Sequence, residues 1–349
     1  MRLRSLAVAL LCVTTMAVAV PGAAVADGGR TVDRADAAAG WLARQLVDGE
    51  RFEVDFNGTK FPDQGLTIDA ILAFASAGVS GTNGGKAIAW LAKPEILSGY
   101  IGDGGTEAYA GATAKATLAA EVRGVNPASF GGVDLPTRLR GLLTPAGRFS
   151  DRSQFGDFSN AFSQSLAIIA LKRTPGGVPV SAVDFAVGTQ CPDGGFPLFF
   201  GASTCVSDTD STAMVVQALL AVGRTTDANE GLAWLVSKQQ ANGGISVGSG
   251  DAATAPNTNT TGLAGQALKA GGRLLAAVKA KRFIVSVQVG CAGQPADRGA
   301  IAYDSSGVNP ATVVRATAQA ILGLGGPSLA QLSAAGSRPG APELACRAA

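Results

Sequence analysis

The stretch Gln190-Cys-Pro-Asp-Gly-Gly-Phe196 decides the fold, because it recurs along the chain. Gln239-Gln-Ala-Asn-Gly-Gly-Ile245 repeats it with Asn in place of Asp, and Gln45-Leu-Val-Asp-Gly49 repeats its first half. Weaker copies start at positions 94, 143 and 288, so successive copies are separated by 49, 49, 47, 49 and 49 residues. So steady a period predicts six copies of one supersecondary unit.

Each copy of this signature is predicted to end the first helix of an α-hairpin. Trp41, Trp90 and Trp234 lie four or five residues before a copy, which is the spacing of a packing anchor on one helix face. The Gly pair then ends the helix, because Gly readily adopts the left-handed conformation. A loop and a second, more apolar helix follow. We predict these second helices at 66–76, 109–120, 161–171, 211–221, 260–270 and 314–324.

The more apolar helix of each hairpin should lie inside the domain. Six such hairpins form either an open solenoid or a closed ring. Closure is favoured, because neither end of the array has a clear polar cap and the tail ends in a cysteine placed to reach back. We therefore predict an all-α fold, an α/α toroid of six helical hairpins in a single domain over 27–349. Its last ~20 residues form a tail tied back by a disulfide, and strands are expected only as short pieces in loops such as 51–56.

The first residues, 1–26, have the features of a secretory signal peptide. Arg2 and Arg4 precede an apolar run, and Ala24-Val-Ala26 is a small-x-small cleavage site. A lone transmembrane anchor is the alternative. Cleavage removes two Arg and no acid, so the net charge of +2 becomes 2 − 2 = 0. We expect a secreted, extracellular protein that binds neither nucleic acid nor, once cleaved, a membrane.

Four cysteines remain after cleavage, and an even count in an exported chain indicates two disulfides. Three pairings are open. We favour Cys191–Cys205, which closes the loop after the fourth signature, and Cys291–Cys346, which ties the tail to the sixth repeat. A zinc site is the alternative, but the chain has no His and no close Cys pair. We therefore predict neither a metal nor a cofactor.

Gln-x-x-Asp-Gly-Gly-Phe after an amphipathic helix, followed by Asp208-Thr-Asp-Ser-Thr-Ala213, resembles the prenyltransferase and squalene-cyclase repeat. The resemblance covers the chain after residue 26. It implies an exported bacterial member of the terpenoid cyclase/prenyltransferase superfamily, with the N-termini of the inner helices around a central cavity. Terpene cyclases, protein prenyltransferase subunits and vitamin B12 carriers share that scaffold, so the resemblance does not fix the function.

Asp208-Thr-Asp-Ser-Thr-Ala213 is similar to the Asp-x-Asp-Asp-Thr-Ala motif of class II terpene cyclases, whose middle acid protonates an alkene or an epoxide. The middle position here is Asp210, and Ser211 replaces the fourth Asp. The other interpretation is a helix cap, because Asp or Ser at a helix start binds free amide groups. Asn160, Asn259 and Asn309 stand near the same place in other repeats.

Phenylalanines crowd the loops before the inner helices. They either form a pocket for an apolar ligand or plug the ring as core. We predict that five of these phenylalanines and the two carboxylates of the Asp208 motif contact the ligand, namely Phe155, Phe158, Phe196, Phe199, Phe200, Asp208 and Asp210. The sequence favours a non-catalytic binding or interaction module for an apolar or bulky ligand, a terpenoid or a corrinoid. The alternatives are a single-domain cyclase-like enzyme with Asp210 as general acid, and a protein that only contacts other proteins.

Overall fold

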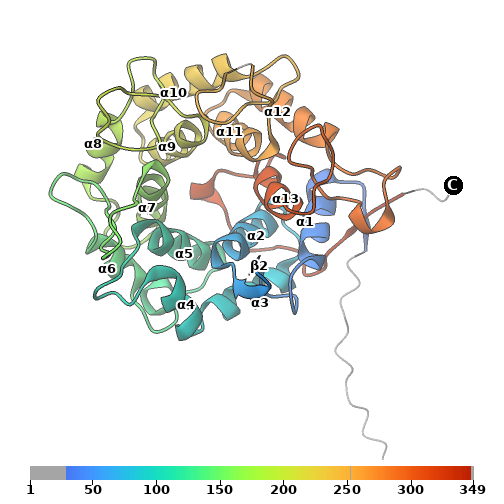
Figure 1. Cartoon of the computed structure of the whole chain (residues 1–349), viewed down its shortest axis with the longest axis horizontal. Coiled ribbons are helices and arrows are strands. Elements are labelled where there is room, and N and C mark those ends of the chain that lie inside the picture. The colour runs from blue at the N-terminus through green and yellow to red at the C-terminus, as the bar shows by residue number, and fades with distance from the viewer. Residues whose placement is uncertain (1–28, 252, 347–349) are drawn as a thin grey trace, which may run out of the picture.

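The computed structural model describes residues 29–251 and 253–346, which form a ring of helices (Figure 1). Residues 1–26, the predicted signal peptide, lie outside the described residues. Six helices form the inner layer: α2 (Gln64–Ala77), α5 (Ala110–Val122), α7 (Ala161–Arg173), α9 (Thr209–Ala221), α11 (Thr258–Ala270) and α13 (Val313–Leu322). Each overlaps a predicted second helix, and each is buried on most of its faces because it packs on both neighbours and on the outer layer.

The outer layer consists of α1 (Arg34–Arg44), α3 (Gly81–Leu91), α4 (Pro94–Ile101), α6 (Leu135–Arg140), α8 (Val180–Gly188), α10 (Thr225–Lys238) and α12 (Leu274–Ser286). The three tryptophans are buried here, as the packing-anchor interpretation predicts. One prediction was wrong. Residues 94–98 are not a decayed signature that ends a helix, because they begin the extra helix α4. That helix continues to Ile101 and ends at Gly102, which has a left-handed φ of 83°.

The ring is closed, because α13 packs against both α1 and α2. The amide of Gln288, in the sixth signature, donates to the carbonyl of Arg34 in α1 at 2.9 Å. Two short strands at the chain ends, β1 (Arg30–Thr31) and β4 (Glu343–Leu344), pair in parallel. Cys191 is bonded to Cys205 and Cys291 to Cys346, the pairing that the cysteine positions favoured. The α/α toroid predicted from the signature is thus confirmed.

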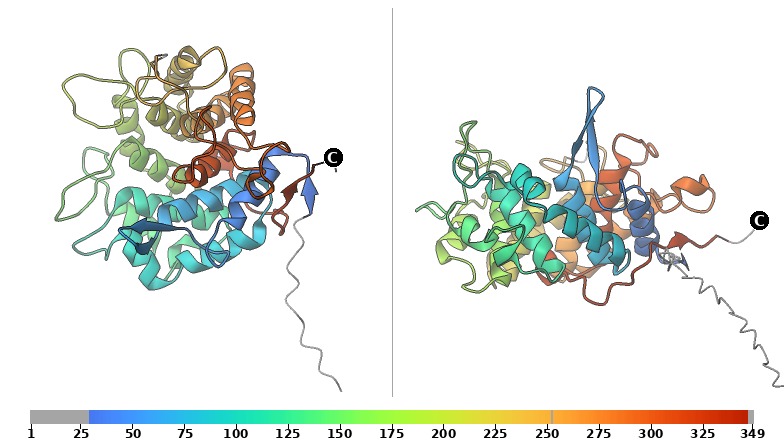
Figure 2. Two further views of the ribbon diagram at one scale, coloured as in Figure 1. Left: turned by 45° about the vertical axis from the view of Figure 1, so that its right-hand side comes forward. Right: turned by 90° about the horizontal axis from the view of Figure 1, so that it is seen from below.

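The tail after α13 closes the end of the ring at which the inner helices finish (Figure 2). Arg173 of α7 donates to the carbonyl of Leu332 at 2.8 Å, and Gln266 of α11 donates to that of Pro327 at 2.7 Å. Leu329 and Leu332 are buried in the hydrophobic cluster that the inner helices share. Side chains therefore fill the ring at this end.

The opposite end of the ring, which we call the loop end, consists of the N-termini of the inner helices and the loops before them. A hairpin of β2 (Glu53–Phe56) and β3 (Thr59–Pro62) projects from it (Figure 2, right). Strand β2 lies within residues 51–56, where a short strand was expected, and β3 follows that range. Among the described residues, none of the helices combines the length and hydropathy needed to cross a bilayer.

Candidate ligand-binding site

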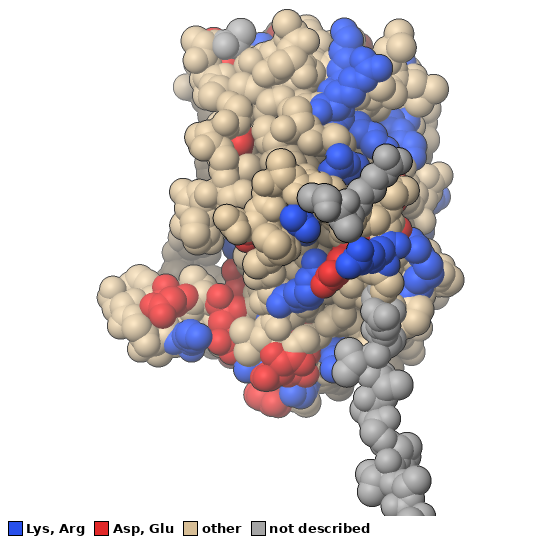
Figure 3. Space-filling model, turned by 90° about the vertical axis from the view of Figure 1, so that its right-hand side faces the viewer, with Lys and Arg blue, Asp and Glu red and all other residues tan. Residues whose placement is uncertain are grey.

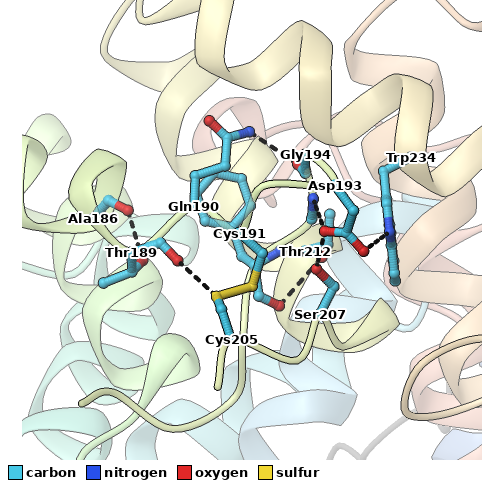
Figure 4. The surroundings of a disulfide bond; sticks show 12 residues. Ala186, Thr189, Gln190, Cys191, Asp193, Gly194, Cys205, Ser207, Thr212 and Trp234 are labelled. Carbon is cyan, nitrogen blue, oxygen red and sulfur yellow. Dashed lines mark hydrogen bonds between the residues drawn. A yellow bond between two sulfur atoms is a disulfide. The ribbon is translucent and has the colours of Figure 1, made fainter. Parts of the chain in front are cut away.

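The fourth signature forms a compact turn that side-chain hydrogen bonds hold together (Figure 4). The Gln190 amide donates to the carbonyl of Gly194 at 2.9 Å and to that of Asp227 in α10 at 3.1 Å, and Gly194 has a φ of 91°. The Asp193 carboxylate accepts from Ser207 at 2.5 Å and from the indole of Trp234 at 2.8 Å. Burial opposes its charge, but these hydrogen bonds lower its pKa. The signature is a structural turn.

A groove of about 290 Å³ lies beside this turn at the loop end. It is formed by the loop that the Cys191–Cys205 disulfide closes and by Gly248 and Ser249 of the next loop. Phe199 and Val206 line it and are 64% and 60% exposed. Exposed apolar side chains in a concave surface are typical of a ligand site.

The predicted phenylalanines separate into four groups. Phe199 lines the groove, whereas Phe155 and Phe158 stand exposed on another loop, before α7. Phe196 is fully buried in a cluster with side chains of α8, α9 and α10, so it belongs to the core and does not line the groove. Phe200 is half-buried and packs edge-on against the ring of Phe185, with ring centroids 5.0 Å apart.

Asp208 and Asp210 differ although both stand at the start of α9. Asp208 is the N-cap, because its carboxylate accepts from the amide of Ser211 at 2.8 Å. It also lines the groove. Asp210 lies in the first turn, and its Oδ1 is shielded from solvent without a hydrogen-bond partner in the described chain. Burial raises the pKa of Asp210 to about 6, a hydrogen bond from Thr260 partly offsets this, and the charge of Asp208 adds to it.

Asn259 occupies the same position in the first turn of α11 as Asp210 in α9, two residues after the N-cap. The cap of α11 is Asn257, so the interpretation of Asn259 as a cap was wrong. Asn309 does not cap α13 either, since Thr312 stands at that N-cap. The Oδ1 atom of Asn259 is also shielded and without a partner among the described residues. Two hydrogen-bond acceptors on neighbouring inner helices are therefore left unpaired.

Charged residues of three neighbouring inner helices, α2, α5 and α13, are paired with one another. Lys115 of α5 lies 2.5 Å from the carboxylate of Asp69 in α2. Arg315 of α13 lies 2.9 Å from Asp63, the N-cap of α2, and 3.9 Å from Asp69. Burial opposes the charge of Lys115, but Asp69 and Tyr100 outweigh this, and the pKa of Lys115 is raised. This network was not predicted from the sequence.

No protein-family model matches the chain, and no curated protein does. Solved structures do match. A protein from Actinoplanes is 16% identical with a TM-score of 0.58, and the match covers 84% of this chain and 98% of that one. The type II terpene cyclase MstE from Scytonema is 13% identical with a TM-score of 0.60, over 83% and 96%.

The unsaturated glucuronyl hydrolase from Bacillus sp. GL1 is 11% identical with a TM-score of 0.56, over 84% of this chain and 95% of that one. At these identities the likeness shows the fold. The chain has the α/α toroid that terpene cyclases share with other enzymes, as its signature indicated. One fold hosts unrelated reactions here, so the function must be argued from the site.

Proposed function

We propose that the protein is an exported ligand-binding module. In this proposal the loop end binds an apolar molecule of terpenoid type that carries a hydroxyl or amine group. The observation that supports it best is the pair of unpaired acceptors, Asp210 Oδ1 and Asn259 Oδ1. A buried acceptor without a donor is unfavourable by about 1–3 kcal/mol, and a ligand donor would remove that penalty. Two disulfides support export, since they persist in oxidising compartments.

The groove supports the apolar part of the ligand. Phe199 and Val206 offer an apolar surface, and Asp208 links the groove to the start of α9, where Asp210 lies. A volume of about 290 Å³ is near the lower end of small-molecule sites (~300–1,000 Å³), which favours a terpenoid over the bulkier corrinoid.

The test is isothermal titration with geranylgeraniol as the probe. Asp210→Asn removes the charged acceptor and should weaken binding by about tenfold or more, because hydrogen bonds to charged groups contribute about 1.5–3 kcal/mol. Phe199→Ser should also weaken it. Phe158→Ser is the matched control, since Phe158 is 70% exposed on another loop. Equal losses in both Phe variants, or no binding to the unaltered protein, would contradict the proposal and favour a protein partner.

A second candidate is acid catalysis by Asp210. The raised pKa of about 6 favours it, because a general acid must hold its proton near the working pH. A neighbouring structure of MstE holds geranylgeranyl dihydroxybenzoate as substrate. If Asp210 protonates an alkene, loss of a proton from the resulting cation gives an isomer of unchanged mass. Chromatography of that compound after incubation tests this, and Asp210→Asn should abolish the new isomer.

A further inference from the structure

A second groove lies where the two chain ends meet. It measures about 750 Å³ and is enclosed by the residues around β1, α1, β4 and the Cys291–Cys346 disulfide. Its lining residues are Arg30, Arg44, Gln45, Cys291, Pro295, Ala296, Arg298, Glu343, Leu344 and Cys346. None of these residues takes part in the ligand site at the loop end.

Positive charge dominates this groove. Three guanidinium groups line it, those of Arg30, Arg44 and Arg298, against the single carboxylate of Glu343. Figure 3 shows this face of the molecule, on which Lys and Arg side chains gather. The small net charge of the whole chain therefore conceals a local excess of cations, and such an excess attracts anions.

The three arginines keep donors available. Within residues 29–251 and 253–346, none of them forms an ion pair. Among the described residues Arg298 uses only its Nε, which donates to the carbonyl of Gly293 at 3.3 Å, so both Nη groups have no partner there. Arg44 uses Nη1, at 3.3 Å from the carbonyl of Ala341. Burial lowers the pKa of Arg44, and Glu343 partly offsets this.

The frame of the groove is rigid, which reduces the entropy lost on binding. The Cys291–Cys346 disulfide and the β1–β4 pairing fix its two edges. The Trp41 indole donates to the carbonyl of Ala296 at 3.1 Å and holds the loop that carries Arg298 against α1. The three guanidinium groups thus come from separate elements that cannot move apart freely.

We propose that this groove binds a molecule with two or more phosphate or carboxylate groups. Arginine suits such groups because its planar fork donates two parallel hydrogen bonds to them. Three guanidinium groups around one groove match an anion that carries several acceptor groups better than they match an ion that carries one. The volume is that of a small-molecule site.

The experiment is calorimetry of the disulfide-bonded protein at low salt, with pyrophosphate and with citrate, beside sedimentation with vesicles of phosphatidylglycerol or phosphatidylcholine. Arg30→Gln/Arg298→Gln should weaken anion binding by at least about tenfold, because each charge-assisted bond contributes roughly a factor of ten. Lys279→Gln/Arg282→Gln is the matched control, since both side chains are exposed on α12, outside the groove. It should change binding by less than about twofold.

Arg44→Lys keeps the charge and removes the fork, so it should also weaken binding if bidentate contacts matter. Binding of pyrophosphate or citrate supports the proposal, and binding of phosphatidylglycerol vesicles alone contradicts it, because each of those headgroups carries a single phosphate. The proposal is overturned if none of these probes binds below about 1 mM. It is overturned equally if the α12 control loses as much affinity as the groove variant, since that would mark non-specific attraction.

Discussion

Two half-buried carboxylates on the inner helices have opposite surroundings. Asp69 of α2 lies 2.5 Å from Lys115 and 3.9 Å from Arg315, so two cations compensate its charge. Asp210 of α9 has no cation within reach in the described chain, and its Oδ1 has no hydrogen-bond partner there. The same ring therefore holds one carboxylate as part of an ion network and leaves another uncompensated.

The difference indicates which of the two is available for function. A buried charge is tolerated when it is paired, and removal of its partner is strongly destabilising. An unpaired carboxylate in the same environment instead keeps its proton to higher pH, which raises the pKa of Asp210 to about 6. Perturbed groups of that kind concentrate at functional sites, whereas paired ones are often structural.

The largest expected effect comes from removing Lys115, the cation that lies nearest to Asp69. Lys115→Met leaves Asp69 half-buried with only the more distant Arg315, and should lower the free energy of unfolding by about 3 kcal/mol. Urea unfolding at pH 7 measures it. Lys172→Met is the control, because Lys172 is an exposed lysine of another inner helix, α7, without an ion pair in the described chain.

The double variant Asp69→Leu/Lys115→Met should recover most of that loss, because apolar residues often replace a buried ion pair without cost. If Lys115→Met is no more destabilising than Lys172→Met, the pair contributes nothing and the contrast with Asp210 disappears.

The uncompensated carboxylate of Asp210 should make the free energy of unfolding depend on pH. The pKa of Asp210 rises from 3.8 to about 6 on folding. Below about pH 3 the carboxyl is protonated in both states. Between about pH 3 and 6 the unfolded chain loses its proton first, so stability falls with rising pH, by up to about 3 kcal/mol in total. Asp210→Asn has no such loss, so its advantage over the unaltered protein should grow from near zero at about pH 3 to that value at about pH 7.

Urea unfolding at four pH values measures this difference. Ser211→Ala, in the same helical turn, carries no titrating group and serves as the control. Its difference from the unaltered protein should stay constant with pH. A constant difference for Asp210→Asn as well would mean that the carboxylate is solvated or paired in solution.

Much of this architecture could be predicted from the sequence because it depends on local patterns. A signature with a steady period predicts hairpins, and Asp208 at the start of an apolar stretch predicts a cap, which the structure has. The burial of the individual phenylalanines was harder to predict. Phe196 and Phe199 are three residues apart in one loop, yet one is buried and the other exposed, because only the fold decides which side of the turn faces α9 and α10.

The sequence indicates that Asp69 and Lys115 are unusual in their helices, but it does not show which residues pair. Asp69 is the only charged residue within α2, and Lys115 lies mid-way along the similarly apolar α5, so each stands out from its helix. Their pairing depends on the packing of the two hairpins, and the contact of Arg315 with Asp63 depends on closure of the ring between repeats six and one. Neither is encoded in a local pattern.

The smallest expected effect concerns the exposed member of the network. The Arg315 side chain is 47% exposed, so water screens its attraction to Asp63 and Asp69. Arg315→Gln should therefore lower the free energy of unfolding by only about 0.5 kcal/mol, and 1 M NaCl should remove even that, because the Debye length falls to about 3 Å. Urea unfolding at low and high salt measures this loss. The control is Arg282→Gln, because Arg282 is exposed and unpaired in the described chain.

A salt-resistant loss as large as that of Lys115→Met would place Arg315 among the buried partners of Asp69. The contrast between Asp69 and Asp210 would then be that two cations stabilise Asp69 and none stabilises Asp210, and it would no longer depend mainly on Lys115.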